Sequence, residues 1–389
     1  MKYISFFILI FTVLDIDASY PESSCGSPIN SIPVVESIIK KMTLEQKVGQ
    51  IIMPDIDEVS PSEAREYQLG TILNGGGKFP NKNKYSSVSD WKNLSKEFYN
   101  SSPIVDGKLV PILWGTDAVH GHNNVIGATI FPHNIGLGST MNPLLIRSIG
   151  DAVAKELLST GIIWTFAPTI AVPQNDLWGR TYEGYSENPI LVSELGKAMI
   201  LGLQGDSKEF LDENHVLATA KHFLGDGGTA DGIDQGNTIL SEKDLIEVHG
   251  KPYFSAIDAC IQSVMASFNS WNGIKMHGNE YFLNDILRVD MGFDGLVVGD
   301  WNGHGQIPGC TKSSCPESFN AGVDIFMVPD EWKLLYKNTL NQVKQGIIDE
   351  SRLDDAVRKI LTVKFKTGLL DGRKPHEYSS NNIGSVKHR

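Results

Sequence analysis

The sequence GLVVGDW, residues 295–301, runs from a glycine through three apolar residues to an acidic one, Asp300. A continuous apolar run of this length is typical of a parallel β-strand, because such a strand is buried on both faces. Seven similar runs recur along the chain: GQIIMP (49–54), LGTILNG (69–75), VPILWGTD (110–117), TFAPTIAV (165–172), VLATAKHF (216–223), SVMASFNS (263–270) and DIFMVP (324–329). The pattern predicts eight buried parallel strands.

Helical patterns separate most of these runs. The clearest are SIGDAVAKELLSTG (148–161), ILVSELGKAMILGLQG (190–205) and NEYFLNDILRVDMG (279–292), each of which closes on glycine, as helices often do. Eight strands alternating with helices predict an α/β protein with a (β/α)8 TIM-type barrel over residues 30–370. A doubly wound open sheet is the alternative that the same pattern allows.

The N-terminus resembles a secretory signal. Lys2 precedes an apolar stretch from Ile4 to Leu14, and Ala18 and Ser19 provide small residues for cleavage. We expect residues 1–19 to be a signal peptide of a secreted or periplasmic protein, with no membrane attachment after cleavage. The other interpretations are an N-terminal core helix and an uncleaved anchor. At the other end, the polar residues 371–389 have the composition of a linker or disordered tail.

Charge and cysteine content narrow the possible partners. The formal net charge of −12 over 389 residues argues against nucleic acid, which carries the same sign. Cys310 and Cys315 close a short loop and are either a disulfide or two free thiols. His120, His122 and His133 could suggest a metal site, but their spacing favours histidines that brace a loop. We expect no metal and no organic cofactor.

Polar residues stand at or near the carboxyl ends of the predicted strands. In a parallel barrel these ends form one face, and that face carries the active site. We therefore expect one pocket to gather the following residues: Asp117, Arg180, Lys221, His222, Asp300 and Trp301.

Several longer segments share a resemblance. They are KMTLEQKVGQI (41–51), GTDAVHGHNNVIGATIFPHNIGLG (115–138), WGRTYEGYSENP (178–189), KHFLGDGGTADGIDQGNT (221–238), SWNGIKMHGN (270–279), GFDGLVVGDW (292–301) and RLDDAVRKILTVKFKTGL (352–369). In this order they resemble glycoside hydrolase family 3, especially its β-glucosidase and β-glucan glucohydrolase branch. The resemblance implies a retaining, exo-acting enzyme that releases terminal glucose from a β-glucoside or β-glucan oligosaccharide.

The resemblance also implies a role for each candidate residue. Asp300 matches the nucleophile, which forms a covalent glycosyl ester in retaining enzymes. Asp117 matches the carboxylate that accepts hydrogen bonds from the sugar, and Trp301 would offer an apolar face to the sugar ring. The donors to the remaining hydroxyls would be Arg180, Lys221 and His222. Two structural alternatives remain: Asp300 as a helix N-cap, and Lys221 with His222 as a buried polar network.

Relatives of this branch continue into a second α/β sandwich domain, which carries the acid/base residue. We expect this chain to lack that domain, and we find no convincing general acid in it. A separate domain or subunit could supply the acid. Asp231 and His304 are the residues to test if the acid lies within the chain. The rival hypothesis is a non-catalytic or impaired sugar-binding barrel.

Overall fold

Seven of the eight predicted apolar runs contain a β-strand, and the eighth, TFAPTIAV (165–172), overlaps one at Thr165. The computed structural model describes residue 25, residues 33–207 and residues 209–389, so the expected signal peptide lies outside the described residues. The eight strands are β1 (Ile52–Met53), β2 (Thr71–Asn74), β5 (Leu113–Thr116), β6 (Trp164–Thr165), β7 (Thr219–Phe223), β9 (Ser263–Ala266), β12 (Leu296–Val298) and β13 (Phe326–Met327). The predicted strand positions are therefore confirmed.

These strands are parallel and pair in a continuous series. Ladders join β2 to β5, β5 to β6, β7 to β9, β9 to β12, and β13 to β1. Parallel bridges complete the series at Asp55 with Leu73, at Trp164 with Leu217, and at Val298 with Ile325. The first strand thus pairs with the last. An open sheet would instead leave two edge strands with one neighbour each.

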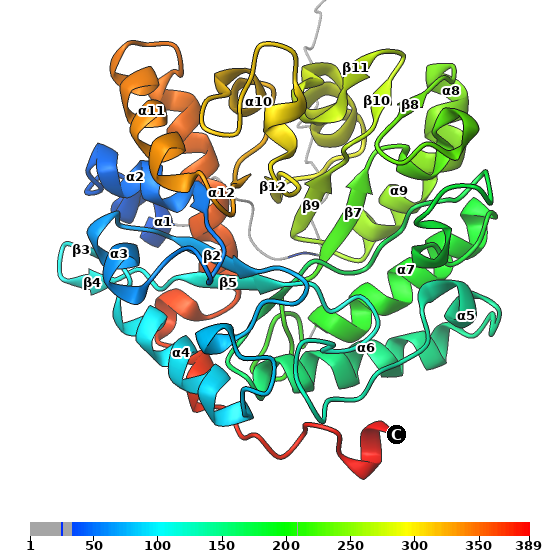
Figure 1. Ribbon diagram of the computed structural model, residues 1–389, viewed down its shortest axis with the longest axis horizontal. Helices are drawn as coiled ribbons and strands as arrows, with labels where there is room; N and C mark the ends of the chain where they lie inside the picture. Colours follow the sequence, from blue (N-terminus) through cyan, green and yellow to red (C-terminus); the bar gives the residue numbers. More distant parts are fainter. Residues whose placement is uncertain (1–24, 26–32, 208) are drawn as a thin grey trace, which may run out of the picture.

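Helices follow most of the strands and lie outside them (Figure 1). The three helical stretches predicted from the sequence fall in α6, α7 and η8, respectively. The helices are α1 (Pro33–Ile39), α2 (Leu44–Gln50), α3 (Pro61–Glu66), α4 (Val88–Asn100), α5 (Asn134–Gly138), α6 (Pro143–Leu158), α7 (Pro189–Gln204), α8 (Glu242–Leu245), α9 (Lys251–Asp258), η8 (Tyr281–Asp290), α10 (Pro316–Asn320), α11 (Trp332–Lys344) and α12 (Glu350–Lys366). The α/β class predicted from the sequence is therefore confirmed.

Local sequence explains where several helices begin. Thr43, Ser60 and Ser87 each accept a hydrogen bond from a backbone N–H in the first turn and form a capping box, so they start α2, α3 and α4. Asn142 and Asn188 cap α6 and α7, and a proline follows each of them at the first helical position.

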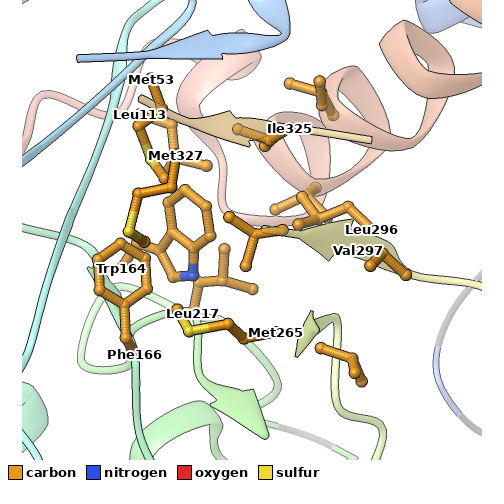
Figure 2. Close-up of a cluster of buried hydrophobic side chains, with 14 of the residues drawn as sticks. Met53, Leu113, Trp164, Phe166, Leu217, Met265, Leu296, Val297, Ile325 and Met327 are labelled. Carbon is orange, nitrogen blue, oxygen red and sulfur yellow. The ribbon is translucent and has the colours of Figure 1, made fainter. Parts of the chain in front are cut away.

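The strands enclose an apolar core. Figure 2 shows side chains from several strands pointing toward one another, with Trp164 and Met327 near the centre. Both are buried, as are Met53, Phe166 and Met265. Because the inward side chains fill the space between the strands, the core is solid, and a binding site has to form at the strand ends.

Smaller strands lie in some of the connections between the eight strands and the helices. The strands β8 (Asn237–Thr238), β10 (Ser270–Trp271) and β11 (Ile274–Lys275) pair in a separate small sheet. A hairpin of β3 (Ile104–Val105) and β4 (Lys108–Leu109) follows α4.

Among the described helices, none is both long enough and apolar enough to cross a membrane.

Two disulfides tie the chain together. Cys310 pairs with Cys315, which settles the alternative that the sequence left open. Cys25 pairs with Cys260, 235 residues away, a link that we did not predict. Spacing could not reveal it, because the geometry of a disulfide depends on how distant segments fold together.

The C-terminal tail lies against α4 and α6 (Figure 1). The carboxylate of Glu156, on α6, accepts hydrogen bonds from the backbone N–H of Gly384 and from the ring of His388. Its other oxygen accepts the N–H of Thr129, in the loop after β5. The same buried carboxylate therefore contacts both the tail and that loop.

Candidate active site

The strand ends carry the predicted residues. Asp117 directly follows β5, Lys221 and His222 lie within β7, and Asp300 stands two residues after β12. Arg180 belongs to the long connection between β6 and α7, just before a short 3-10 helix (Thr181–Glu183). Because parallel strands end on the same side, these distant segments meet there.

Lys221 and Asp117 form an ion pair. The Nζ atom of Lys221 lies 2.6 Å from Oδ1 of Asp117. The lysine side chain is almost buried, whereas 38% of the Asp117 side chain is exposed. The second carboxylate oxygen of Asp117 is therefore able to accept a hydrogen bond from a ligand, and a lysine ammonium has two further N–H groups to donate.

Arg180 is held on two sides. Its guanidinium donates to both carboxylate oxygens of Glu183, at 2.7 and 2.9 Å, and its Nη2 atom lies 3.0 Å from Nε2 of His222. Burial alone would raise the pKa of Glu183, but the ion pair with Arg180 outweighs it and lowers that pKa. We had not singled out Glu183, which stands three residues after Arg180 in the motif WGRTYEGYSENP.

The ring of His222 has a partner for each nitrogen. Nδ1 lies 2.8 Å from Oδ2 of Asp226, and Nε2 faces the donor group of Arg180. An arginine can only donate, so Nε2 accepts and Nδ1 carries the proton. Burial, with help from the nearby cations, puts the pKa of His222 well below its usual value, which keeps the ring neutral. Burial raises the pKa of Asp226 to about 7.

Lys221 and His222 therefore belong to a buried polar network and also face the site. The two interpretations of this pair were not exclusive. Asp226, in the segment GDGG (225–228), was not among the residues predicted for the site. Its position four residues after His222, inside a motif already singled out, was the available signal.

Asp300 is a largely buried carboxyl group. Its side chain is 13% exposed, and Oδ2 lies 3.8 Å from Nε2 of His222. Its Oδ1 atom accepts the backbone N–H of Trp301 at 2.7 Å. Burial raises the pKa of Asp300 to about 6, against the opposing effects of Arg180, this N–H and Lys221.

Asp300 is not a helix cap. The next helical turn begins at Gly303 and is preceded by Asn302, which makes no side-chain capping bond. One carboxylate oxygen of Asp300 instead lies 3.8 Å from the ring of His222, so the N-cap interpretation does not hold.

Trp301 lies over a glycine. A Cβ atom built on Gly75 would fall 2.5 Å from the Trp301 ring, so no larger residue fits there without moving the indole. The backbone N–H of Gly75 donates to Oδ2 of the buried Asp55 at 2.9 Å. The indole is 39% exposed and can offer a face to a ligand.

The three histidines of the loop after β5 have separate partners. His120 stacks with His133 at 4.0 Å between ring centroids, and its Nδ1 atom bonds the carbonyl of Phe131. His122 is buried and bonds the hydroxyl of Thr160. In the described part of the chain, one group combines three potential metal ligands within reach of one another, and it contains Cys310 and Cys315, which are bonded to each other.

The two reserve candidates for a general acid differ in exposure. His304 is buried, and its Nε2 atom lies 2.7 Å from the carbonyl of Lys312, so this nitrogen is a donor to the backbone. Asp231 is exposed. Neither contacts the carboxylate of Asp300 in a hydrogen bond.

Several known proteins are similar to this chain in sequence and in structure. The profile described as the glycosyl hydrolase family 3 N terminal domain matches residues 43–363. A lysosomal beta glucosidase of Dictyostelium discoideum is 29% identical over 91% of the chain, and a periplasmic beta-glucosidase of Salmonella typhimurium is 30% identical over 88%. The crystal structure of an exo-1,3/1,4-beta-glucanase from a Pseudoalteromonas species superposes with a TM-score of 0.88 at 47% identity over 93% of the chain.

This chain is shorter than those relatives. It spans 46% of the Dictyostelium protein, 43% of the Salmonella protein and 47% of the Pseudoalteromonas chain. The shared region is therefore about half of each.

Proposed function

The chain belongs to glycosyl hydrolase family 3, and from this premise we propose that it is a retaining, exo-acting β-glucosidase or β-glucan exohydrolase with Asp300 as nucleophile. The observation that carries the proposal is the setting of Asp300. Its carboxyl group is largely buried, close to His222, and under the electrostatic influence of Arg180 and Lys221. Such a group can attack a sugar and is kept ionised in most molecules at neutral pH.

We propose a closed (β/α)8 TIM-type barrel over residues 30–370 as the framework of this site. The pairing of β1 with both β2 and β13 supports it. So does the gathering of Asp117, Lys221 and Asp300 at the carboxyl ends of three strands, which is where barrel enzymes hold their catalytic groups.

The binding roles follow from the free hydrogen-bonding capacity of each group. Asp117 would accept a sugar hydroxyl on its exposed oxygen, while Lys221 and Arg180 would donate to others. Both nitrogens of His222 are already engaged, so we assign it the role of fixing Arg180 beside the sugar. Trp301 would pack against the C–H face of the ring.

The reaction needs two groups. Asp300 forms a bond to the anomeric carbon as the bond to the leaving oxygen breaks, and that oxygen takes a proton from a general acid. Water then hydrolyses the ester with the same group acting as base. Asp117 and Glu183 each form an ion pair with a basic side chain, and Asp226 is hydrogen-bonded to the neutral ring of His222. We therefore propose that a separate domain or subunit supplies the acid.

The rival proposal is a non-catalytic or impaired sugar-binding domain. The ion pairs of Asp117 and Glu183 favour it, because those two carboxylates are suited to bind rather than to transfer a proton. The two proposals differ in whether Asp300 forms a covalent bond to sugar.

A trapping experiment separates them. The protein is incubated with dinitrophenyl 2-deoxy-2-fluoro-β-glucoside, whose leaving group departs without an acid and whose fluorine slows hydrolysis of the ester. Mass spectrometry of the digested protein should find the fluoroglucosyl group on the peptide that contains Asp300. Asp300→Asn is the matched control and should stay unlabelled. Binding of glucose without any adduct would support the rival.

We also propose that the protein is secreted or periplasmic. The disulfides Cys25–Cys260 and Cys310–Cys315 support this, because disulfides persist in oxidising compartments. The mature N-terminus should lie near Tyr20, which N-terminal sequencing of natively expressed protein would test.

A further inference from the structure

We propose, resting on the function proposed above, that His277 is a positioning residue: its Nε2 atom accepts a hydrogen bond from the backbone N–H of Asp300 and so fixes the orientation of the nucleophile. His277 lies in the motif SWNGIKMHGN, in a short 3-10 helix (Met276–Gly278), and it is 1% exposed. It is not bonded to the carboxylate of Asp300 itself, and it acts through the peptide that carries it.

The two ring nitrogens of His277 have opposite roles. Nδ1 lies 2.8 Å from the carbonyl oxygen of Ser267, which can only accept, so Nδ1 carries the proton. Nε2 is then a lone-pair acceptor, 2.8 Å from the backbone nitrogen of Asp300. Burial lowers the pKa of His277 to about 3, so the ring keeps this acceptor throughout the neutral range.

The turn that follows β12 is held by hydrogen bonds on two sides, and His277 provides the bond on one of them. On one side, the N–H of Gly299 donates to the carbonyl of Ile325, and the N–H of Asn302 donates to the carbonyl of Met327. Both of these carbonyls belong to the segment DIFMVP (324–329), which contains β13. The N–H of Asp300 faces the other way, toward His277. Without this ring, the peptide that carries the nucleophile would lose its hydrogen bond on that side.

Packing holds the ring in this place. A Cβ atom on Gly303 would fall 2.4 Å from the ring of His277, and one on Gly299 would lie 3.5 Å from it. Only a glycine at position 303 therefore lets the turn approach the imidazole this closely, whereas Gly299 lies at ordinary contact distance. The ring of Phe268 flanks it at 5.9 Å between centroids. The imidazole thus has one available position, and that position sets the direction of the Asp300 peptide.

The substitutions that test this role separate the two nitrogens. The amide oxygen of His277→Gln can reach the place of Nε2 and accept the same N–H. His277→Asn offers polar atoms near Nδ1 only, and His277→Phe offers none. Ser318→Ala is the matched control, because the Ser318 hydroxyl donates to the backbone carbonyl of His277 and does not touch the ring.

With azide present, so that attack by Asp300 and not release of the ester limits turnover, we expect the Asn and Phe variants to lose about 10²-fold in kcat on dinitrophenyl β-glucoside, the size of effect that a misplaced reacting group produces. Their KM should change little, because the sugar contacts remain. His277→Gln should recover most of kcat, and Ser318→Ala should keep it even if its melting temperature falls. A kcat that follows melting temperature across all four variants would overturn the positioning role.

A measurement on the unaltered protein tests the contact without any activity. In the 15N-labelled full chain, a scalar coupling across the N–H···N bond should connect the Asp300 amide with Nε2 of His277. Absence of the coupling, with both signals assigned, would refute the inference whatever the activity. A coupling in a chain that forms no adduct on Asp300 would show instead that the proposed function fails and that the contact is only structural.

Discussion

Asp300→Asn should make the protein more stable while abolishing turnover. In the folded chain the pKa of Asp300 is raised to about 6, mainly by burial, against an unfolded value of about 3.9. One pKa unit corresponds to about 1.4 kcal/mol, so a shift of about two units is a cost of about 3 kcal/mol for holding the charged form. The 13% exposure of the side chain reduces this to about 2 kcal/mol.

The pH dependence gives this prediction its sign. Because the folded-state pKa is the higher one, folded protein binds more protons than unfolded protein between about pH 4 and pH 6, and stability falls as the pH rises through that range. Above about pH 6 the cost is complete, and below about pH 4 it is absent. Asparagine carries no charge at any of these pH values and can still accept the N–H of Trp301 through its amide oxygen.

Urea unfolding followed by tryptophan fluorescence at a series of pH values measures the effect. At pH 8 the variant should unfold with a free energy about 2 kcal/mol higher than that of the unaltered protein, and the two should converge near pH 4. A difference that does not change with pH, or a variant that is less stable at pH 8, would refute the assignment of Asp300 as a buried carboxylate that is ionised at a cost in stability.

Three further predictions concern separate parts of the molecule. Gly75→Ala should displace the Trp301 ring, which would raise KM for an aryl β-glucoside about 10-fold with a smaller effect on kcat. An unchanged KM would count against a sugar contact at Trp301. Lys364 is buried, its pKa is lowered to about 7, and Gln50 is its hydrogen-bond partner. Lys364→Met should therefore stabilise the protein by about 4 kcal/mol at pH 7. Urea titrations should show this gain shrinking as the pH rises from about 7 to 10 and vanishing above about pH 11, where the lysine is neutral in both states. If a separate domain or subunit supplies the acid, the 389-residue chain by itself should hydrolyse cellobiose or laminaribiose poorly, since an acid contributes about 10²–10⁴-fold. It should still release dinitrophenolate measurably from an activated glucoside, and azide should accelerate turnover. Efficient disaccharide cleavage would direct attention to Asp231 and His304.

The family and the α/β class could be predicted from the sequence because their signals are local. A continuous apolar run has the same meaning wherever it occurs, so all eight strands were found from their own residues. The ends of the strands were less accurate. The run TFAPTIAV (165–172) predicts a strand of eight residues, but the observed strand is Trp164–Thr165, which begins one residue before the run and ends early, since Pro168 has no N–H to continue a ladder. The closed barrel and the catalytic role of Asp300 stay proposals, supported by the strand pairing and by the setting of the carboxyl group.

Most of the candidate site was also visible in the sequence. Asp117, Lys221 and Asp300 follow or end apolar runs, and that position alone indicated that they would meet. The residues that support them were not predicted. Glu183, Asp226 and His277 all lie inside motifs that the sequence analysis quoted, but their spacing does not show which side chain each one holds.

The type and order of the strands and helices can be predicted from the sequence, because propensity, periodicity and capping act over a few residues. The partner of each polar group depends instead on the folded arrangement of distant segments. Cys25 joins Cys260, Asp117 pairs with Lys221 over 104 residues, and Asp300 donates its N–H to a histidine 23 residues before it. These contacts depend on directions and distances of a few ångströms between segments that approach one another only after the strands have paired and their apolar faces are buried. The same burial raises the pKa of Asp300, which no local pattern encodes.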